Sequence, residues 1–230
     1  MNCRDATGHD RRYRSIARFS ATDKMPLVMK IRSIAFMFGW LAVMACLLFP
    51  AGLHAGVPTD QTRATIDQVL EVLNNPKLKS KSAKEERRSR LRQVIYPRFD
   101  FAEMARRSLG LTWQRISPGE QQEFLKLFTQ LLEESYVSNI ESYSGEKILY
   151  WREIEDQGFA EVDTKIITNR GEEFTINYKL HELNGDWKVY DLVIENVSIV
   201  NNYRSQFSRL LAKYSFAELL DRIREKLATF

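Results

Sequence analysis

Few residues of this chain have the types and spacing that catalysis requires. His181 is the only histidine after residue 55, and no second histidine or cysteine lies at metal-ligand spacing from it, so we expect a surface role. Asp191 is the one acid inside an apolar run, and an inward-facing carboxylate there would need a partner. We favour a structural role for Asp191, capping backbone N–H groups or pairing with arginine. The alternative is a pocket enzyme with Asp191 or Tyr178 as its acid–base group.

Composition and motifs exclude several classes of protein. The chain is 44% hydrophobic and 28% charged, which excludes a largely disordered chain and a protein with several membrane spans. Residues 1–55 carry 8 Lys/Arg and 3 Asp/Glu, whereas residues 56–230 carry 26 and 27, so the basic excess lies at the N-terminus. We therefore expect no nucleic-acid partner. Both cysteines, Cys3 and Cys46, precede residue 56, and no phosphate-binding loop or zinc motif is present, so we expect no cofactor and no metal.

Residues 29–55 are typical of a secretory signal peptide. A basic start, Met29-Lys30-Ile31-Arg32, precedes the apolar run 34–49, and small residues lead to Ala55. Cleavage after Ala55 would start the mature chain at Gly56, and the alternative is an uncleaved single-helix anchor. We interpret residues 1–28 as the product of a start codon placed too early, or else as a disordered cytosolic extension. Residues 56–230 are expected to form a single domain.

Helical patterns fill the first half of the mature chain. Apolar residues recur at three- and four-residue steps over 59–74, and a second helix is expected from Ser82, with Glu85 completing a capping box. The charged run 84–90 (KEERRSR) could meet an anionic partner, but we interpret it as a solvated helix face. Asp100 is predicted to cap a third helix. A long fourth helix is predicted from Ser117-Pro118-Gly119-Glu120 to Ser144-Gly145.

From Lys147 the sequence period changes to that of strands. Four β-type runs, 148–154, 159–168, 173–183 and 187–197, are separated by turns that contain glycine or asparagine. The second and third runs alternate between an apolar and a wet face. The fourth is apolar on both faces, so we expect cover on both sides. Two helices end the chain, and Ser215 with Glu218 forms a capping box for the second.

These patterns predict an α+β fold. We expect a four-stranded or slightly larger antiparallel twisted sheet wrapped by about six helices, with an apolar cavity between sheet and helices. The aromatic residues expected to point into that space are Phe101, Trp113, Phe124, Phe128, Tyr136, Phe174, Tyr178 and Trp187. A filled core and a cavity for acyl chains use the same residue types, so composition leaves both open.

Four segments carry a resemblance to a known family. They are YPRFDFAEMARRSLGLTW (96–113), SPGEQQEFLKLFTQLL (117–132), FTINYKL (174–180) and WKVYDLVIENVSIVNNYRSQF (187–207). In this order they resemble the MlaC, or toluene-tolerance, family of periplasmic phospholipid-binding proteins, from about Val57 to the C-terminus. One departure is Asn196, where the family usually has glycine. Asparagine also tolerates the left-handed backbone conformation, so the turn should survive.

The resemblance implies a carrier without a catalytic step. It would move a phospholipid with two acyl chains between an outer-membrane lipoprotein complex and an inner-membrane ABC transporter complex, and so maintain outer-membrane lipid asymmetry. The carrier would be a monomer in the periplasm of a Gram-negative cell. Because each buried CH₂ stabilises the complex by ~0.8 kcal/mol, a partner must open the carrier or accept the lipid. The alternatives are a carrier of another apolar lipid such as a hopanoid, an enzyme of dehydratase or isomerase type, and an envelope scaffold with a filled core.

The predicted lipid-binding residues come from the inward faces of these elements. They are Phe101, Met104, Phe124, Phe128, Val162, Ile166, Ile176, Tyr178, Trp187 and Val189. Arg204 is predicted to contact the headgroup or the mouth, because guanidinium matches phosphate geometry, or alternatively to pair with Asp191. Segment 187–207 is expected to form one wall of the cavity.

Overall fold

The computed structural model describes residues 56–230, and the predicted signal peptide and upstream extension lie outside the described residues. The described part contains six α-helices, and none of these is both long enough and apolar enough to cross a membrane. They are α2 (Val57–Asn74), α3 (Lys84–Ile95), α4 (Phe101–Leu109), α5 (Pro118–Glu141), α6 (Ile199–Leu211) and α7 (Phe216–Leu227).

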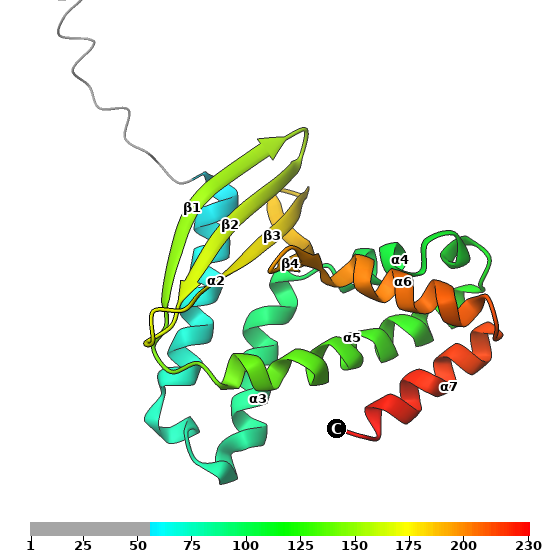
Figure 1. The fold of residues 1–230 in the computed structure, drawn as a ribbon, viewed down its shortest axis with the longest axis horizontal. Helices are drawn as coiled ribbons and strands as arrows, with labels where there is room; N and C mark the ends of the chain where they lie inside the picture. The colour runs from blue at the N-terminus through cyan, green and yellow to red at the C-terminus, as the bar shows by residue number, and fades with distance from the viewer. Residues whose placement is uncertain (1–55) are drawn as a thin grey trace, which may run out of the picture. The chain divides into compact units, whose positions relative to one another are not determined.

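An antiparallel sheet of five strands follows α5 in the chain and precedes α6 (Figure 1). Its strands are β1 (Lys147–Asp156), β2 (Phe159–Ile167), β3 (Glu173–Leu183), β4 (Asp186–Ile194) and β5 (Val197–Ser198), arranged in sequence order. This arrangement and the six helices confirm the predicted α+β fold class. The β4–β5 turn places Glu195 at φ 48° and Asn196 at φ 64°. Asparagine therefore takes the left-handed conformation, as predicted.

Strand β4 corrects the prediction that one strand is apolar on both faces. The β3–β4 register shifts between Lys179, which pairs with Asp191, and Leu180, which pairs with Val189, so Tyr190 is an extra residue. A bulge of one residue reverses the alternation of side chains beyond it. The apolar residues on either side of the bulge therefore share the inner face of the sheet: Trp187 and Val189 before it, Leu192 and Ile194 after it.

Helix starts follow local chemistry in most cases. Both predicted capping boxes form, at Ser117 with Glu120 and at Ser215 with Glu218, and the Asp100 side chain caps α4. The predicted cap at Ser82 is wrong. A 3₁₀ turn over Lys81–Ala83 comes first, and the helix then begins at Lys84 without a side-chain cap. Helix α5 also ends at Glu141, earlier than the predicted stop at Ser144-Gly145.

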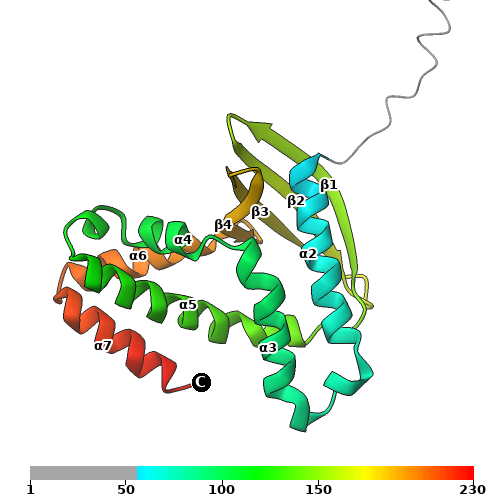
Figure 2. The same cartoon turned by 180° about the vertical axis from the view of Figure 1, so that it is seen from behind.

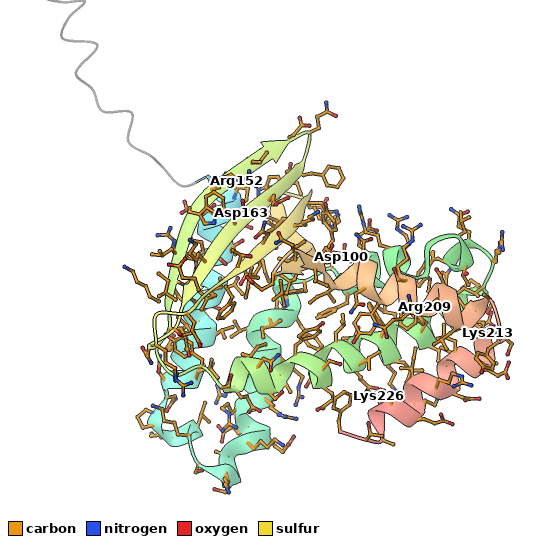
Figure 3. The ribbon with its side chains drawn as sticks, viewed as in Figure 1. Asp100, Arg152, Asp163, Arg209, Lys213 and Lys226 are labelled. Carbon is orange, nitrogen blue, oxygen red and sulfur yellow. The ribbon has the colours of Figure 1, made fainter. Side chains whose placement is uncertain are left out.

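The outer face of the sheet carries polar residues, as predicted, but not all of them are wet. Asp163 on β2 is fully buried and accepts a hydrogen bond of 2.5 Å from Nε of Arg152 on β1 (Figure 3). His181 on β3 lies 3.0 Å from a carboxylate oxygen of Asp100, which starts α4. The sequence suggested no partner for this histidine, because the two residues are far apart in the chain.

The helices form two groups, which Figures 1 and 2 show from opposite sides. Helix α2 lies along the inner face of the sheet, where it contacts β1, β2 and β4, and α3 packs beside it. Helices α4, α5, α6 and α7 pack against one another, and of these α4 and α6 also contact β4. We call their shared apolar interior the helical core. It is filled by aromatic rings whose centroids lie 5.3 to 5.8 Å apart: Phe124, Phe128, Tyr203 and Phe207.

Candidate functional site

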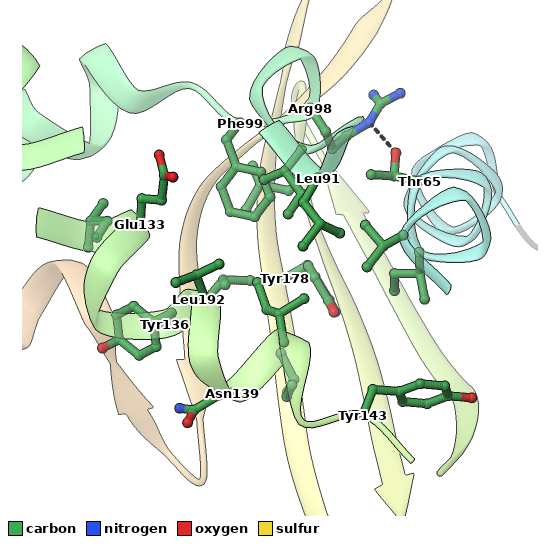
Figure 4. Close-up of a pocket in the computed structure, with 18 of the residues that line it drawn as sticks. Thr65, Leu91, Arg98, Phe99, Glu133, Tyr136, Asn139, Tyr143, Tyr178 and Leu192 are labelled. Carbon is green, nitrogen blue, oxygen red and sulfur yellow. Dashed lines mark hydrogen bonds between the residues drawn. The ribbon is translucent and has the colours of Figure 1, made fainter. Parts of the chain in front are cut away.

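A cavity of about 510 Å³ lies between the inner face of the sheet, α2, α3 and the C-terminal half of α5 (Figure 4). Its volume falls in the range of sites that hold small molecules. Aliphatic and aromatic side chains dominate its wall: Ile66, Val69, Leu70 and Leu73 from α2, Leu91 and Ile95 from α3, Leu132, Tyr136, Val137 and Ile140 from α5, and Ile148, Ile166, Phe174, Ile176, Tyr178, Val189, Leu192 and Ile194 from the sheet. Such a wall favours hydrocarbon over a polar solute.

Six of the residues predicted to bind lipid line this cavity: Phe101, Met104, Ile166, Ile176, Tyr178 and Val189. Strand pairing brings the cavity residues of the sheet together. Ile176 on β3 pairs with Thr164 on β2 and with Ile194 on β4. A backbone contact positions the α4 pair. The Asp100 N–H donates to the carbonyl of Val189 at 2.9 Å, which ties the start of α4 to β4 beside the cavity.

Phe124 and Phe128 do not line the cavity, contrary to our expectation. Both are completely buried in the helical core. The reason is the length of α5, whose 24 residues span about 36 Å. Its apolar stripe is continuous in sequence but serves two compartments. Its first turns pack against α7, and only its last turns, from Leu132 onward, reach the cavity.

Val162 and Trp187 also lie off the cavity wall. They belong to a small packed cluster on the inner face, together with Ala160, Leu180 and Val189. This cluster sits near the β1–β2 and β3–β4 hairpins. Side-chain alternation placed both residues on the correct face of the sheet. How far along that face the cavity extends depends on where α2 crosses it, which alternation does not determine.

Arg204 forms no ion pair with Asp191 among the described residues, and its predicted headgroup contact stays a prediction. It is exposed on α6 and is not among the residues that line the cavity. Its guanidinium lies against Gly110, where a Cβ would come within 3.3 Å of the guanidinium nitrogens. Gly110 has φ 58° and follows the last residue of α4. This close approach and the positive φ both favour glycine at that position.

Asp191 has the structural role that we favoured. It is buried and faces away from the cavity, and one carboxylate oxygen accepts from the N–H of Val200 at 3.0 Å. The other accepts from Oγ of Ser198 at 2.6 Å. The carboxylate therefore satisfies donors at the start of α6, where the positive end of the helix dipole favours an anion. An acid–base role for Asp191 in the cavity is thus not supported by its position.

Polar groups also border the cavity, and the sequence identified Tyr136 and Tyr178 but not Thr62 or Arg98. Thr62 on α2 is buried, and its hydroxyl has no partner among the described residues. Burial raises the pKa values of the Tyr136 and Tyr178 hydroxyls, so both stay neutral at physiological pH. Arg98 donates to Thr65 on α2 at 3.1 Å (Figure 4). It also donates to Gln61 on α2 and to Asp186 and the Trp187 carbonyl on β4, at 2.5 to 2.7 Å.

Part of the charged run 84–90 also lies at this border. Its other charged residues are exposed and include an ion pair between Glu86 and Arg90, as predicted for a solvated face, but Arg87 and Arg88 are not exposed. Arg87 and Arg88 both donate to Glu141 on α5, and Arg88 also reaches Glu134. The two arginine side chains are only 16% and 13% exposed. We call this set of contacts, with the Arg92–Glu133 pair, the α3–α5 seam. Periodicity missed it because the acidic partners lie more than 40 residues away in the chain.

A profile of the MlaC protein family matches residues 63–225. The chain belongs to the MlaC family. Two curated relatives of this MlaC family member are similar in sequence. The intermembrane phospholipid transport system binding protein MlaC of Haemophilus influenzae is 25% identical over 143 residues, which cover 60% of this chain and 67% of the relative. The toluene tolerance protein ttg2D of Pseudomonas putida is 24% identical over 156 residues, 67% of this chain and 73% of the relative.

A solved structure shares the fold of this MlaC family member. It is a phospholipid-binding protein from Ralstonia solanacearum in complex with a phospholipid, and it aligns with a TM-score of 0.69 at 23% identity. The alignment covers 76% of this chain and 98% of that protein. The alignment therefore leaves a larger share of this chain unmatched than of the neighbour. The likeness independently supports the α+β architecture described above.

Proposed function

We propose that this chain is a phospholipid carrier whose cavity holds the acyl chains. The observation that carries the proposal is an apolar cavity of about 510 Å³, between sheet and helices, in a member of the MlaC family. The names of the two relatives and the phospholipid complex of the structural neighbour support it. The proposed chain-contacting residues are the six predicted ones on the wall, Phe101, Met104, Ile166, Ile176, Tyr178 and Val189, joined by Ile66, Val69 and Leu70 of α2.

The proposed setting is the periplasm, between two membranes. We propose that a monomer of this chain exchanges a lipid with two acyl chains between an outer-membrane lipoprotein complex and an inner-membrane ABC transporter complex. The word intermembrane in the name of the Haemophilus relative supports this setting, as does the signal-like segment 29–55. Burial of two acyl chains makes spontaneous release slow, so hand-over to a partner is the step that the proposal requires.

Lipid extraction tests the proposal directly. The full chain is expressed in a Gram-negative host, purified from the periplasmic fraction without detergent, and extracted with organic solvent for mass spectrometry. We expect about one diacyl phospholipid per protein. Recovery of a hopanoid would instead support the alternative cargo. Protein that carries no lipid and takes up no labelled phospholipid from vesicles would reject the carrier role.

A pocket enzyme is the competing function, and Tyr178 is the residue that could serve it. Its hydroxyl is the acid–base candidate that remains on the cavity wall. The substitution Tyr178→Phe keeps the ring and removes the hydroxyl. We expect this variant to retain lipid and to exchange it with vesicles at a rate within about twofold of wild type, because the ring supplies the apolar contact. Loss of function in Tyr178→Phe with unchanged folding would favour the enzyme.

A further inference from the structure

Three arginines line the cavity, Arg88, Arg92 and Arg98, and they differ in the length of their contacts with protein partners. Arg98 has four acceptors, on α2 and on β4. Three of these acceptors share its Nη1, and the guanidinium links α2 to β4, so drawing it toward a ligand would break the link between two walls of the cavity. A guanidinium that binds a ligand needs donors that it can release from its protein partners at small cost.

Arg92 is also strongly bound. It donates to Glu133 on α5 at 2.5 Å, and the hydroxyl of Tyr96 donates to the same carboxylate at 2.7 Å. The Glu133 carboxylate raises the pKa of Arg92. Burial, together with the hydrogen bond from Tyr96 to Glu133, raises the pKa of Tyr96. Drawing Arg92 away from Glu133 would therefore break a short charged contact and leave that carboxylate with the neutral Tyr96 hydroxyl.

Arg88 stands apart from these two. Its guanidinium contacts Glu134 at 3.2 Å and Glu141 at 3.3 Å, which are the longest contacts in the α3–α5 seam. It shares Glu141 with Arg87, whose own contacts to that carboxylate are 2.6 and 2.7 Å. Glu141 would thus stay paired if Arg88 moved away. Arg88 is nevertheless 13% exposed, so it is a shielded cation on an apolar wall.

An amphipathic ligand fits this arrangement in one orientation. Acyl chains belong among the aliphatic residues of α2, α3 and the sheet, and an anionic head belongs at a cation on the border of that space. Glu134 is the more exposed partner of Arg88, at 33%, and can turn toward water. Replacing the Glu134 carboxylate by the anionic head of the ligand keeps Arg88 paired throughout. This exchange avoids the large cost of an unpaired buried charge.

We propose that Arg88 binds the phosphate of the bound lipid, exchanging its contacts with Glu134 and Glu141 for phosphate oxygens. This inference rests on the proposed phospholipid-carrier function and adds a headgroup site at the α3–α5 seam. The guanidinium offers two parallel N–H donors to a phosphate, a geometry that lysine cannot reproduce. Glu134 is a competitor of the lipid phosphate in this scheme, so removing it strengthens phospholipid binding.

Arg63 is the nearest rival as a headgroup site. It lies on α2 beside a second, open hollow that shares Ile66, Leu70, Glu146 and Ile148 with the wall of the cavity. Two acids, Asp67 and Glu146, line the same hollow, and the Arg63 guanidinium sits 4.5 Å from the centre of the Tyr150 ring. Arg63 is exposed and is not among the residues that line the cavity, so it is a less shielded cation than Arg88.

Competition between two lipids with the same acyl chains tests the proposal. The purified chain is incubated with vesicles that contain equal amounts of dioleoyl phosphatidylglycerol and dioleoylglycerol, which lacks phosphate, and protein-bound lipid is quantified by mass spectrometry. We expect Arg88→Gln to lower the ratio of bound phospholipid to bound diacylglycerol by about tenfold or more, as loss of a charge-assisted contact predicts. We expect Arg88→Lys to fall between wild type and Arg88→Gln, and Glu134→Gln to raise the ratio.

The control is Arg224→Gln, which removes an ion pair between α7 and Glu123 on α5, away from the cavity. Its ratio should equal that of wild type. The ratio is measured on folded protein only, so a loss of stability does not mimic the result. An unchanged ratio in Arg88→Gln, or a lowered ratio in Glu134→Gln, would overturn the headgroup site and leave the carrier function standing. A wild-type protein that takes up neither lipid would overturn both.

Discussion

The helical core and the cavity contain similar apolar side chains, yet one is filled and the other is hollow. In the helical core, Phe124 and Phe128 are fully buried, and Tyr203 and Phe207 meet the Phe128 ring edge-on. Around the cavity, the apolar residues of α2 are only half-buried, although the sheet lies opposite them. Residue type therefore does not distinguish the two regions.

Polar contacts at the edges of the cavity explain the difference. The N-terminus of α2 is held by Glu153 on β1, whose carboxylate accepts from the Thr59 N–H at 2.8 Å. Arg98 links α2 to β4, and the α3–α5 seam links α3 to α5 through long side chains. These contacts fix the separation of the elements at the edges of the cavity. The ion pair between Arg224 of α7 and Glu123 of α5 is more than 40% exposed at both side chains, so it lies outside the helical core, where the rings touch.

The largest expected effect is in the helical core. Phe128→Ala should lower the free energy of unfolding by about 3–5 kcal/mol, because it removes a fully buried ring and leaves a cavity. Urea denaturation followed by circular dichroism measures the change. Folded Phe128→Ala should still carry lipid, since Phe128 is not on the cavity wall. Loss of lipid from folded protein would show that the two regions are coupled.

A smaller loss is expected where the helical core joins the sheet. Asp191→Ala removes the two carboxylate oxygens that accept from the Val200 N–H and the Ser198 hydroxyl at the start of α6. The substitution should cost about 2–3 kcal/mol of unfolding free energy. Thermal and urea unfolding measure this cost. Lipid content at a temperature well below the transition should match wild type. A stable Asp191→Ala variant that loses its lipid would contradict the structural role.

Filling the cavity should change the free energy of unfolding little and the amount of bound lipid strongly. In Ile176→Trp a larger ring projects from β3 into the cavity, so we expect a change of less than about 1.5 kcal/mol in unfolding free energy together with loss of most bound lipid. Lipid per protein, measured by mass spectrometry, is the readout. Val193→Trp on the outer face of the adjacent strand is the matched control and should keep its lipid. Full lipid content in Ile176→Trp would show that lipid binds elsewhere.

The mildest expected effect is a pH dependence on α4. Hydrogen bonds from Arg106 and Arg107 lower the pKa of Glu103 to about 2. A carboxylate whose folded pKa is depressed contributes stability above its unfolded pKa and loses it as pH falls toward the folded value. Wild-type melting temperature should therefore fall between about pH 4.5 and pH 2 more steeply than that of Glu103→Gln. Equal slopes for the two proteins would exclude this contribution. The control is Glu225→Gln at an exposed position of α7, which should behave like wild type.

Local patterns predicted most of the framework. Apolar periods located the helices and four of the strands, the capping boxes at Ser117 and Ser215 marked helix starts, and Asn196 marked a turn. Alternation along β2 and β3 predicted which face each side chain occupies, including Ile166, Ile176 and Tyr178. Each of these signals spans only a few residues, so the sequence alone contains the information.

The tertiary structure decided where the cavity lies and what borders it. The bulge at Tyr190 placed Leu192 and Ile194 on the inner face, which a strict alternation misassigns. The Arg88 contacts on α5 and the Asp100–His181 pair join residues 46 to 81 positions apart. The sequence by itself determined the elements and their apolar faces, because those depend on neighbours in the chain. Whether two apolar faces touch or enclose a space depends on long-range polar contacts that hold them apart, and only the fold brings those partners together.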